Sequence, residues 1–321
     1  SVSSTGLKVF TLGYSFESDN FVTEDLTLLS EHVTRSGITR LEYAPEPHSV
    51  IYGVRNDGKI VVLTVLRDQK IAGWARFSMG GTDAEAESVA IIAAPDGDPS
   101  SVGRTNRAHD QPWLIVKRTV GGVTKRHIEF IEDVFEDDEP INDGYFLDNG
   151  VTQNLTVATA AVTGLSHLAG ETVDVLADGK VLLDQTVAAD GTLTLPAVAN
   201  LVHVGYRYSS DFQSLRLDIA APDGTAQSSL GRIDHIVLRL HASMGGQYGP
   251  SSDELTDLDL VPDTHTMDTV APLFSDDIEV DFDAGWDTYS EVFVRQNQPL
   301  PFTLIALLPR LQKGQRGNRA R

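Results

Sequence analysis

The chain has 321 residues, 41% of them hydrophobic, and its 46 acidic and 25 basic residues give a formal net charge of −21. This acidic balance opposes sequence-independent binding to nucleic acid, and the absence of cysteine excludes disulfide frameworks and cysteine-based zinc sites. The longest apolar runs, IVVLTVL and FTLIALL, are far shorter than the ~20 residues that span a bilayer, so we expect no membrane segment.

One segment near the N-terminus has helical periodicity. Apolar residues recur there at intervals of three and four, namely Val22, Leu26, Leu29 and Val33. Asn20 or Thr23 provides a candidate N-cap, and Gly37 a candidate stop. We therefore predict one short helix over about residues 22–34.

The rest of the chain is predicted to be mainly β. Segments rich in Val, Ile, Leu, Thr and Tyr alternate with Asp-Gly pairs, whose positive φ angles suit tight hairpin turns. These pairs are Asp57-Gly58, Asp96-Gly97, Asp143-Gly144, Asp178-Gly179, Asp190-Gly191 and Asp223-Gly224. SVIYGV-RNDG-KIVVLTVL and ETVDVL-ADG-KVLLDQTV are typical of two strands joined by such a turn.

Residues 38–132 resemble two consecutive repeats of the length and rhythm of β-propeller blades. Two blades do not close a ring. In chain order we predict a β-propeller-like part over 1–135, an acidic linker over 136–150, a small β domain over 151–200, a C-terminal β domain over 201–309 and a basic tail over 310–321. The two later β domains are expected to be small barrels or sandwiches.

The stretch GLSHLAGETVD contains the pair Ser166-His167, followed by acids. A serine nucleophile needs a histidine within hydrogen-bond reach. Adjacent residues on a strand point to opposite faces, and the G-x-S-x-G elbow is missing. We therefore expect Ser166 to be a turn hydroxyl and His167 to pack, half-buried, between Leu165 and Leu168.

Other chemical motifs are weak. Asp281 and Asp283 form one of the carboxylate pairs that a glycosidase would use, but a chain this acidic contains many such pairs by chance. DIEVDFDAGWD departs from the EF-hand register, although alternating acids of this kind suit Ca²⁺ or Mg²⁺ at a turn. No HExxH motif is present, and the Gly-Gly loops lack the P-loop pattern. We predict a protein that is not an enzyme and uses no cofactor.

Charge is distributed unevenly in the last third of the chain. No Lys or Arg occurs between His241 and Val294, and we single out five acids there as candidate lumen or interface residues: Asp276, Asp277, Glu279, Asp281 and Asp283. The tail RLQKGQRGNRAR is purely basic and forms a candidate docking arm: Arg310, Lys313, Arg316, Arg319 and Arg321. A generic solvated acidic surface and a frayed, solvated terminus are the alternatives.

The strand PLPFTLIALLPRL precedes this tail. Phe302, Leu304, Ala306 and Leu308 alternate along it with Thr303, Ile305 and Leu307, so both of its faces are apolar. A strand of this kind lies in the centre of a sheet or is covered by a neighbour. A core strand within one domain and a strand at a subunit contact both fit.

Several long stretches, in order along the chain, carry a family resemblance: SVIYGVRNDGKIVVLTVLRDQKIAGWARFSM, WLIVKRTVGGVTKRHIEFIE, GLSHLAGETVDVLADGK, RIDHIVLRLHASMGG and DAGWDTYSEVFVRQNQPLPFTLIALLPR. The chain resembles the tail nozzle proteins of short-tailed bacteriophages (podoviruses), also called tail tubular protein B or DNA-stabilisation protein. The resemblance covers nearly the whole chain and starts inside the family pattern.

The resemblance implies a structural virion protein in the distal part of the phage tail. Such proteins form homo-oligomeric rings, commonly hexamers, which act as a channel or plug for the genome and contact adaptor and fibre proteins. Viral DNA would pass through without specific binding. The alternatives are a β-rich tail adhesin that binds a host receptor or glycan, and a tail-borne cell-wall hydrolase.

Overall fold

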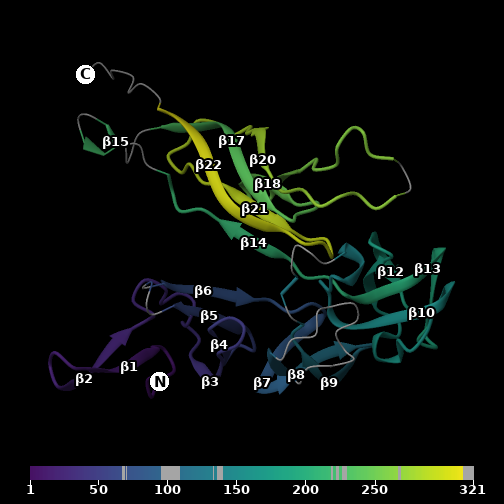
Figure 1. Ribbon diagram of the computed structural model, residues 1–321, viewed down its shortest axis with the longest axis horizontal. Coiled ribbons are helices and arrows are strands. Elements are labelled where there is room, and N and C mark those ends of the chain that lie inside the picture. The colour runs from purple at the N-terminus through teal and green to yellow at the C-terminus, as the bar shows by residue number, and fades with distance from the viewer. Residues whose placement is uncertain are drawn as a thin grey trace. The chain divides into compact units, whose positions relative to one another are not determined.

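Antiparallel strands make up most of the protein (Figure 1). The computed structural model describes residues 1–66, 69, 71–94, 109–132, 134–135, 140–217, 220–221, 224–225, 230–266 and 269–313. Within these ranges the helical elements are two 3-10 turns, η1 (Ile141–Asp143) and η2 (Ser166–Leu168). The prediction of a mainly β protein is therefore confirmed.

The chain divides into two compact units. The first combines Ser1–Val134, Leu147–Val173 and Asp184–Tyr206, and the second combines Phe135–Phe146, Asp174–Leu183 and Arg207–Arg321. Each unit is therefore assembled from segments that are far apart in the sequence.

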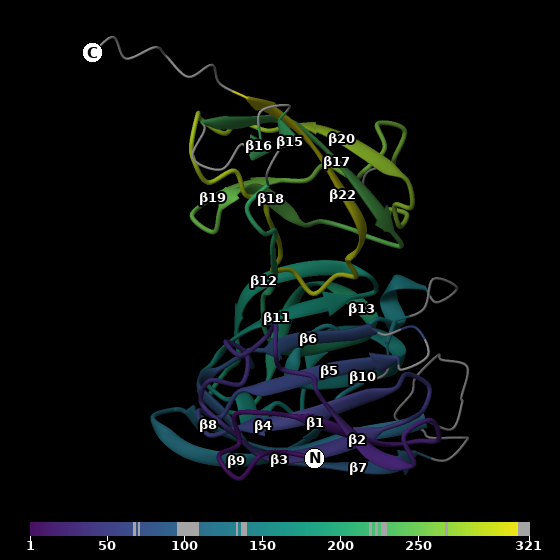
Figure 2. The same ribbon diagram turned by 90° about the vertical axis from the view of Figure 1, so that its left-hand side faces the viewer.

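Three antiparallel sheets form the N-terminal part of the first unit (Figure 2). β1 (Phe10–Ser15) and β2 (Asn20–Asp25) make a hairpin. A four-stranded sheet follows in the order β3 (Ile38–Ala44), β4 (Val50–Arg55), β5 (Ile60–Leu66) and β6 (Ile71–Phe77). A three-stranded sheet then contains β7 (Thr82–Ala94), β8 (His109–Val120) and β9 (Val123–Phe130).

Strand β5, in the interior of the β3–β6 sheet, is buried on both faces because its alternate residues enter different cores. Val62 packs with Val89 and Val116 of the β7–β9 sheet. Val61, its neighbour in the sequence, packs on the opposite face with Val9 and other residues from the N-terminal segment. This is the expected result of a side-chain period of two.

A further four-stranded sheet has the order β10 (Asp148–Val162), β13 (Leu193–Tyr206), β11 (Thr172–Ala177) and β12 (Lys180–Thr186). β10 and β13 are long, and three shifts in register interrupt their pairing. Such irregularities bend a strand and increase its twist.

Two sheets and a short hairpin belong to the second unit. The first sheet has the order β14 (Ser210–Gln213), β21 (Phe293–Gln296), β18 (Gln247–Ser251) and β19 (Glu254–Asp257). The second has the order β20 (Asp277–Asp281), β17 (Gly231–His241) and β22 (Thr303–Lys313), and β15 (Ala220–Ala221) pairs with β16 (Gly224–Thr225). Ile236 and Leu238 of β17 share one core with Val294 of β21. None of the sheets in the described ranges closes into a barrel.

The predicted helix over residues 22–34 is wrong. Asn20–Asp25 is strand β2, which pairs residue by residue with β1, and turns follow it. Asp25 accepts hydrogen bonds from both the backbone N–H and the hydroxyl of Thr27, which fixes the chain in a turn. A helix would have placed Leu29 on the same buried face as Val33, but Leu29 is 93% exposed.

The two-sided apolar strand at the C-terminal end is β22, which lies at one edge of its sheet beside β17. Leu304, Leu307 and Leu311 pack against the core of the second unit. Ile305 and Leu308 remain 58% and 49% exposed. One face of this strand thus contributes to the core of its own unit, and the other retains apolar side chains at the surface.

We expect Gly58→Ala to lower the free energy of unfolding by about 1–3 kcal/mol, because it forces a side chain into the left-handed region and into Glu85. Gly58 has φ +72° in the turn between β4 and β5, and a Cβ there would lie 2.4 Å from Cβ of Glu85. Urea unfolding measures the change.

Gly73→Ala is the matched control for this substitution. Gly73 lies in β6, and a Cβ there meets nothing within 4 Å. We expect the control to be neutral or slightly stabilising. Equal losses in the two variants would contradict the role assigned to the turn.

Candidate functional site

Ser166 and His167 lie in the 3-10 turn η2, not on a strand as the sequence argument assumed. The Nε2 atom of His167 lies 3.1 Å from the carbonyl oxygen of Asn149 in β10. Its ring packs edge-on against His127 of β9, with ring centroids 6.1 Å apart. His167 is half-buried and engages other strands, while Ser166 is exposed. The pair is therefore not arranged as a nucleophile and its base.

The most highly organised group of ionisable side chains in the first unit surrounds Arg118 of β8. The Arg118 side chain has no exposed surface. Its guanidinium donates to both carboxylate oxygens of Glu129 on β9, and its Nε donates to the carbonyl oxygen of Gly80 at 2.8 Å. The guanidinium carbon also lies 5.8 Å from the ring centroid of Tyr206 on β13. A charge this deeply buried requires such compensation.

The loop between β6 and β7 completes the environment of Arg118. The N–H of Gly80 donates to Oδ2 of Asp148 at 2.5 Å. Gly81 has φ +96°, and a Cβ there would lie 2.9 Å from Cδ of Arg118 and 3.1 Å from the Tyr206 ring. Only glycine satisfies both the backbone angle and the space available.

Burial controls ionisation around this cluster. It raises the pKa of Asp148 from 3.8 to about 6, although the Gly80 N–H and Arg118 act in the opposite direction. Burial and the nearby Glu171 carboxylate raise the pKa of Tyr206 to about 12. Burial also lowers the pKa of His127. Glu171 itself accepts from the N–H of Gly121 at 2.9 Å.

The Arg118 cluster is suited to holding strands together, because a substrate cannot reach a guanidinium with no exposed surface. It joins β8, β9, the Gly80-Gly81 loop and the ends of β10 and β13. No motif in the sequence pointed to it. The available signal was the alternation in β8, where Val116, Arg118 and Val120 occupy successive inward positions and are all buried.

The five acids singled out in the sequence lie on and beside β20. Asp277, Glu279 and Asp281 alternate with Ile278 and Val280, which pack into the core, so the three carboxylates share the outer face. Arg239 of β17 binds Asp277 through two hydrogen bonds of 2.7 and 2.8 Å, and this interaction lowers the pKa of Asp277. Asp276 accepts from the N–H of Asp277, and Asp283 is exposed beyond the end of the strand.

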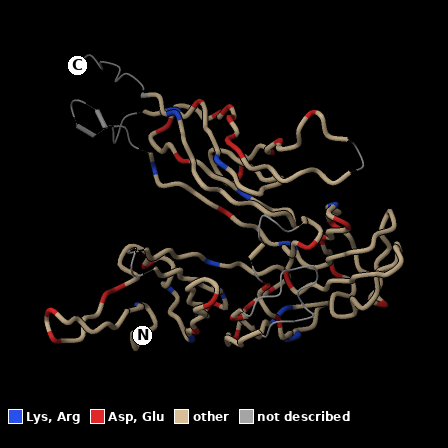
Figure 3. The backbone as a smooth tube through the Cα atoms, in the orientation of Figure 1, with Lys and Arg blue, Asp and Glu red and all other residues tan. Residues whose placement is uncertain are grey.

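The side chains of Glu279 and Asp281 are more exposed than that of Asp277. Nε2 of His235 in β17 contacts a carboxylate oxygen of Glu279, and its Nδ1 lies 4.0 Å from Oδ1 of Asp281. Figure 3 shows acidic residues along this part of the second unit, next to the basic residues of the neighbouring strands. The outer face of β20 is therefore a row of carboxylates, with Arg239 and His235 of β17 along one side of it.

Only the first part of the basic docking arm lies within the described residues. Arg310 donates to both carboxylate oxygens of Asp234, at 3.0 and 2.6 Å, and so joins β22 to β17. Lys313 is the last residue of β22. Arg316, Arg319 and Arg321 lie outside the described residues. Arg310 is thus engaged within its own sheet and does not extend as a free arm.

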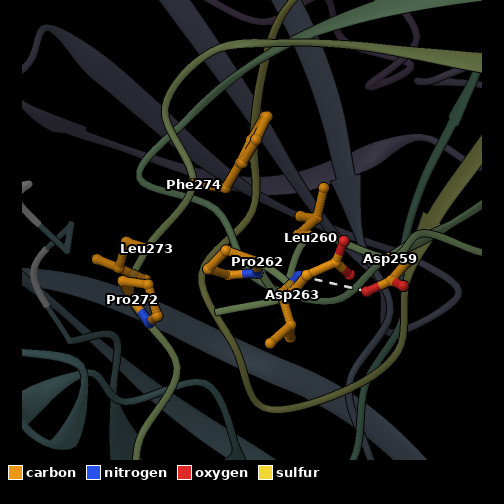
Figure 4. Close-up of a pocket in the computed structure, with 8 residues that line it drawn as sticks. Asp259, Leu260, Pro262, Asp263, Pro272, Leu273 and Phe274 are labelled. Carbon is orange, nitrogen blue, oxygen red and sulfur yellow. Dashed lines mark hydrogen bonds between the residues drawn. The ribbon is translucent and has the colours of Figure 1, made fainter. Parts of the chain in front are cut away.

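A shallow hollow in the second unit has a volume of about 380 Å³. It is lined by Asp259, Leu260, Val261, Pro262, Asp263, Pro272, Leu273 and Phe274 (Figure 4). Asp259 accepts from the N–H of Val261 at 3.3 Å, which orders the loop itself. The hollow does not bring together an acid, a base and a nucleophile.

The described part of the chain contains no group of three His, Asp or Glu side chains placed to hold a metal ion. It also contains no helix long and apolar enough to cross a membrane. In comparisons with known proteins, no family model and no curated protein matches the chain.

We expect Glu129→Ala to lower the free energy of unfolding by about 3–5 kcal/mol, because it leaves the Arg118 charge buried without its partner. Urea unfolding at neutral pH measures the loss. The double variant Arg118→Met with Glu129→Leu removes both charges and should recover most of it. A double variant as unstable as Glu129→Ala would show that shape, and not charge, controls this position.

Because the pKa of Asp148 is raised, we expect this carboxyl to stabilise the folded protein at low pH and to lose that effect as the pH increases. The folded state retains the proton up to about pH 6, whereas the unfolded carboxyl loses it near 3.8. The stabilisation is therefore complete below about pH 4 and decreases by at most about 3 kcal/mol as the pH rises through 6. Urea unfolding of the native protein and of Asp148→Asn across this pH range measures the effect as the difference between their free energies of unfolding. A difference independent of pH would contradict the prediction.

Proposed function

We propose that the protein is a non-enzymatic structural component of a short bacteriophage tail, where its copies form a ring through which viral DNA passes. The structural role is supported by the positions of the arginine side chains. Many of them bind carboxylates on other strands of the same sheet, and such paired hydrogen bonds fix geometry. The strand-to-strand pairs are Arg118–Glu129, Arg126–Glu87, Arg239–Asp277, Arg295–Asp211 and Arg310–Asp234.

The acids of β20 support a role beside DNA. Asp277, Glu279 and Asp281 project from one face of the strand, and Asp281 is fully exposed. Like charges repel the phosphate backbone, and at physiological salt this repulsion extends about 8 Å. A ring whose lumen carried such a row in every copy would allow DNA to slide without adhering to the wall.

The sheets β3–β6 and β7–β9 support the propeller-like part of the proposal. They pack face to face through a single core that includes Val54, Ile60, Ala86 and Leu114. Successive propeller blades pack in this way. We propose that these two sheets are consecutive blades, and that the two sheets of the second unit form a small sandwich.

The tail assignment itself rests on the sequence resemblance, which implies a ring of commonly six copies in contact with adaptor and fibre proteins. Mass measurement and negative-stain microscopy of the purified chain test the ring, and immunogold labelling of virions tests the tail location. A chain that remains a monomer and is missing from virions would refute the proposal. A chain that binds host glycans instead would support the adhesin alternative.

We expect the double variant Glu279→Gln with Asp281→Asn to slow genome ejection, because it removes two exposed negative charges per copy from the proposed lumen. Asp253→Asn with Glu254→Gln, in the turn after β18 and at the first residue of β19, is the matched control and should eject DNA at the native rate. Fluorescence of a DNA-binding dye during ejection in vitro gives both rates. Equal rates for the two variants and the native virion would remove the lumen assignment.

A further inference from the structure

Two histidine rings meet where strand β9 contacts the 3-10 turn η2. His127 projects from β9 and His167 from η2, and the two rings meet at an interplanar angle of 84°. The N–H of Leu165, directly before η2, donates to the carbonyl oxygen of Gly191 at 3.0 Å and so attaches η2 to the turn between β12 and β13. Both histidines are half-buried. We call His127 and His167 the histidine joint.

The hydrogen bonds of the histidine joint favour neutral rings. The carbonyl oxygen of Asn149 only accepts, so the Nε2 atom of His167 that faces it carries a hydrogen. The Nδ1 atom of His127 is buried and has no hydrogen-bond partner within the described residues. A protonated ring has a donor at both nitrogens, and a buried donor without an acceptor costs free energy.

The charged groups around His127 come from its own strand and from the elements packed against it. Burial is the main cause that lowers the pKa of His127 from its ordinary value of 6.5. The Glu129 carboxylate on β9 acts in the opposite direction, whereas Arg118 of β8, His167 of η2 and Lys125 of β9 lower the pKa further. The ring therefore lies where a positive charge is unfavourable.

The histidine joint is one of several polar contacts between the β7–β9 sheet and the β10–β13 sheet. The N–H of Gly80, before β7, donates to Asp148 of β10, and the N–H of Gly121, between β8 and β9, donates to Glu171 before β11. By contrast, an aliphatic core attaches the β7–β9 sheet to the β3–β6 sheet, and its buried members are Val, Ile, Leu and Ala side chains. A change of pH acts on the polar contacts and leaves the aliphatic core uncharged.

We propose that the histidine joint is an acid-sensitive switch, in which protonation of His127 and His167 separates β9 from η2 and loosens the β10–β13 sheet from the β7–β9 sheet. Like charges on two rings in contact repel each other, and partial burial limits the screening of that repulsion. Opening gives both rings access to water, which stabilises their charged forms. Histidine is also the side chain whose charge ordinarily changes between pH 5 and 8. The switch goes beyond the proposed tail role and does not rest on it.

Asp148 responds to pH at the same contact between sheets, but with the opposite sign. The folded protein holds a proton on this carboxyl up to about pH 6, so acid favours the closed form through Asp148. His127 binds a proton less readily in the closed form than in water, so acid favours the open form through His127. Asp148→Asn removes the opposing effect and retains an oxygen that accepts from the N–H of Gly80. The histidine effect is therefore measured in full-length Asp148→Asn.

Amide hydrogen exchange at Gly80 measures the opening, because its N–H is held across the contact between the two sheets. The rate is divided by that of an unstructured chain at the same pH, which gives a protection factor. We expect this factor to fall about tenfold between pH 7.5 and pH 5, the effect of one unit of pKa difference, and to recover on neutralisation. The amide of Val62, in the interior strand β5, should keep its protection.

Three further substitutions, each combined with Asp148→Asn, assign the effect to the histidine joint. His127→Phe keeps a ring beside His167 but takes no proton, so the protection of Gly80 should stay within about twofold across the pH range. His167→Gln keeps a donor for the Asn149 carbonyl and should also reduce the fall. His48→Gln, in the exposed connection between β3 and β4, is the matched control and should retain the full tenfold fall.

Three results would overturn the switch. The first is a protection factor of Gly80 that does not change with pH in Asp148→Asn. The second is a full tenfold fall in both His127→Phe and His167→Gln, because the histidines would then not be its cause. The third is an equal loss of protection at Val62, because acid would then unfold the whole first unit and not open one contact.

Discussion

A guanidinium with no exposed surface fixes the joint between two sheets of the first unit. Arg118 is buried in a sheet that is otherwise aliphatic at the neighbouring inward positions, and so it needs a partner for its charge and its donors. Glu129, the Gly80 carbonyl and the Tyr206 ring meet that need from three different segments. Because a buried charge tolerates little displacement of its partners, the relative positions of β8, β9 and the end of β13 are restricted together.

Basic side chains are also placed between strands in the rest of the described protein. A chain with 46 acids and 25 basic residues has too few cations to neutralise its surface. Arginines are placed where strands meet, as with Arg239 between β17 and β20 and Arg310 between β22 and β17. Asp281, which has no arginine partner among the described residues, is left facing solvent. The arginine–carboxylate pairs thus hold the sheets together, and the acidic side chains in excess of the basic ones give the surface its negative charge.

Local turn chemistry was the most predictable part of the fold. Gly58, Gly179 and Gly191 all have positive φ, as the Asp-Gly pairs predicted. Gly144 does not, because its φ of −70° closes the turn η1 in an extended conformation. Asp96, Gly97 and Asp223 lie outside the described residues. These successes share a cause, since a hairpin turn depends on the two residues that form it.

Features decided by contacts with other strands were not predictable. Residues 22–34 have helical spacing, yet Phe21 and Val22 pair with β1, and a strand partner outweighs a weak local preference. The sequence analysis assigned no role to Arg118, and only the opposing Glu129 and Gly80 explain its burial. The acids of β20 were recognised as a group, but their shared face became clear only from the strand that carries them.

The segmented construction of the two units has a consequence for biosynthesis. The chain passes between them at residues 134/135, 146/147, 173/174, 183/184 and 206/207. The first unit lacks its last strand until Tyr206 has left the ribosome, because β10 pairs with β13. Until then, the long edge of β10 is open to any other nascent chain. Truncation before Tyr206 would therefore release a fragment prone to aggregation, not a smaller stable protein.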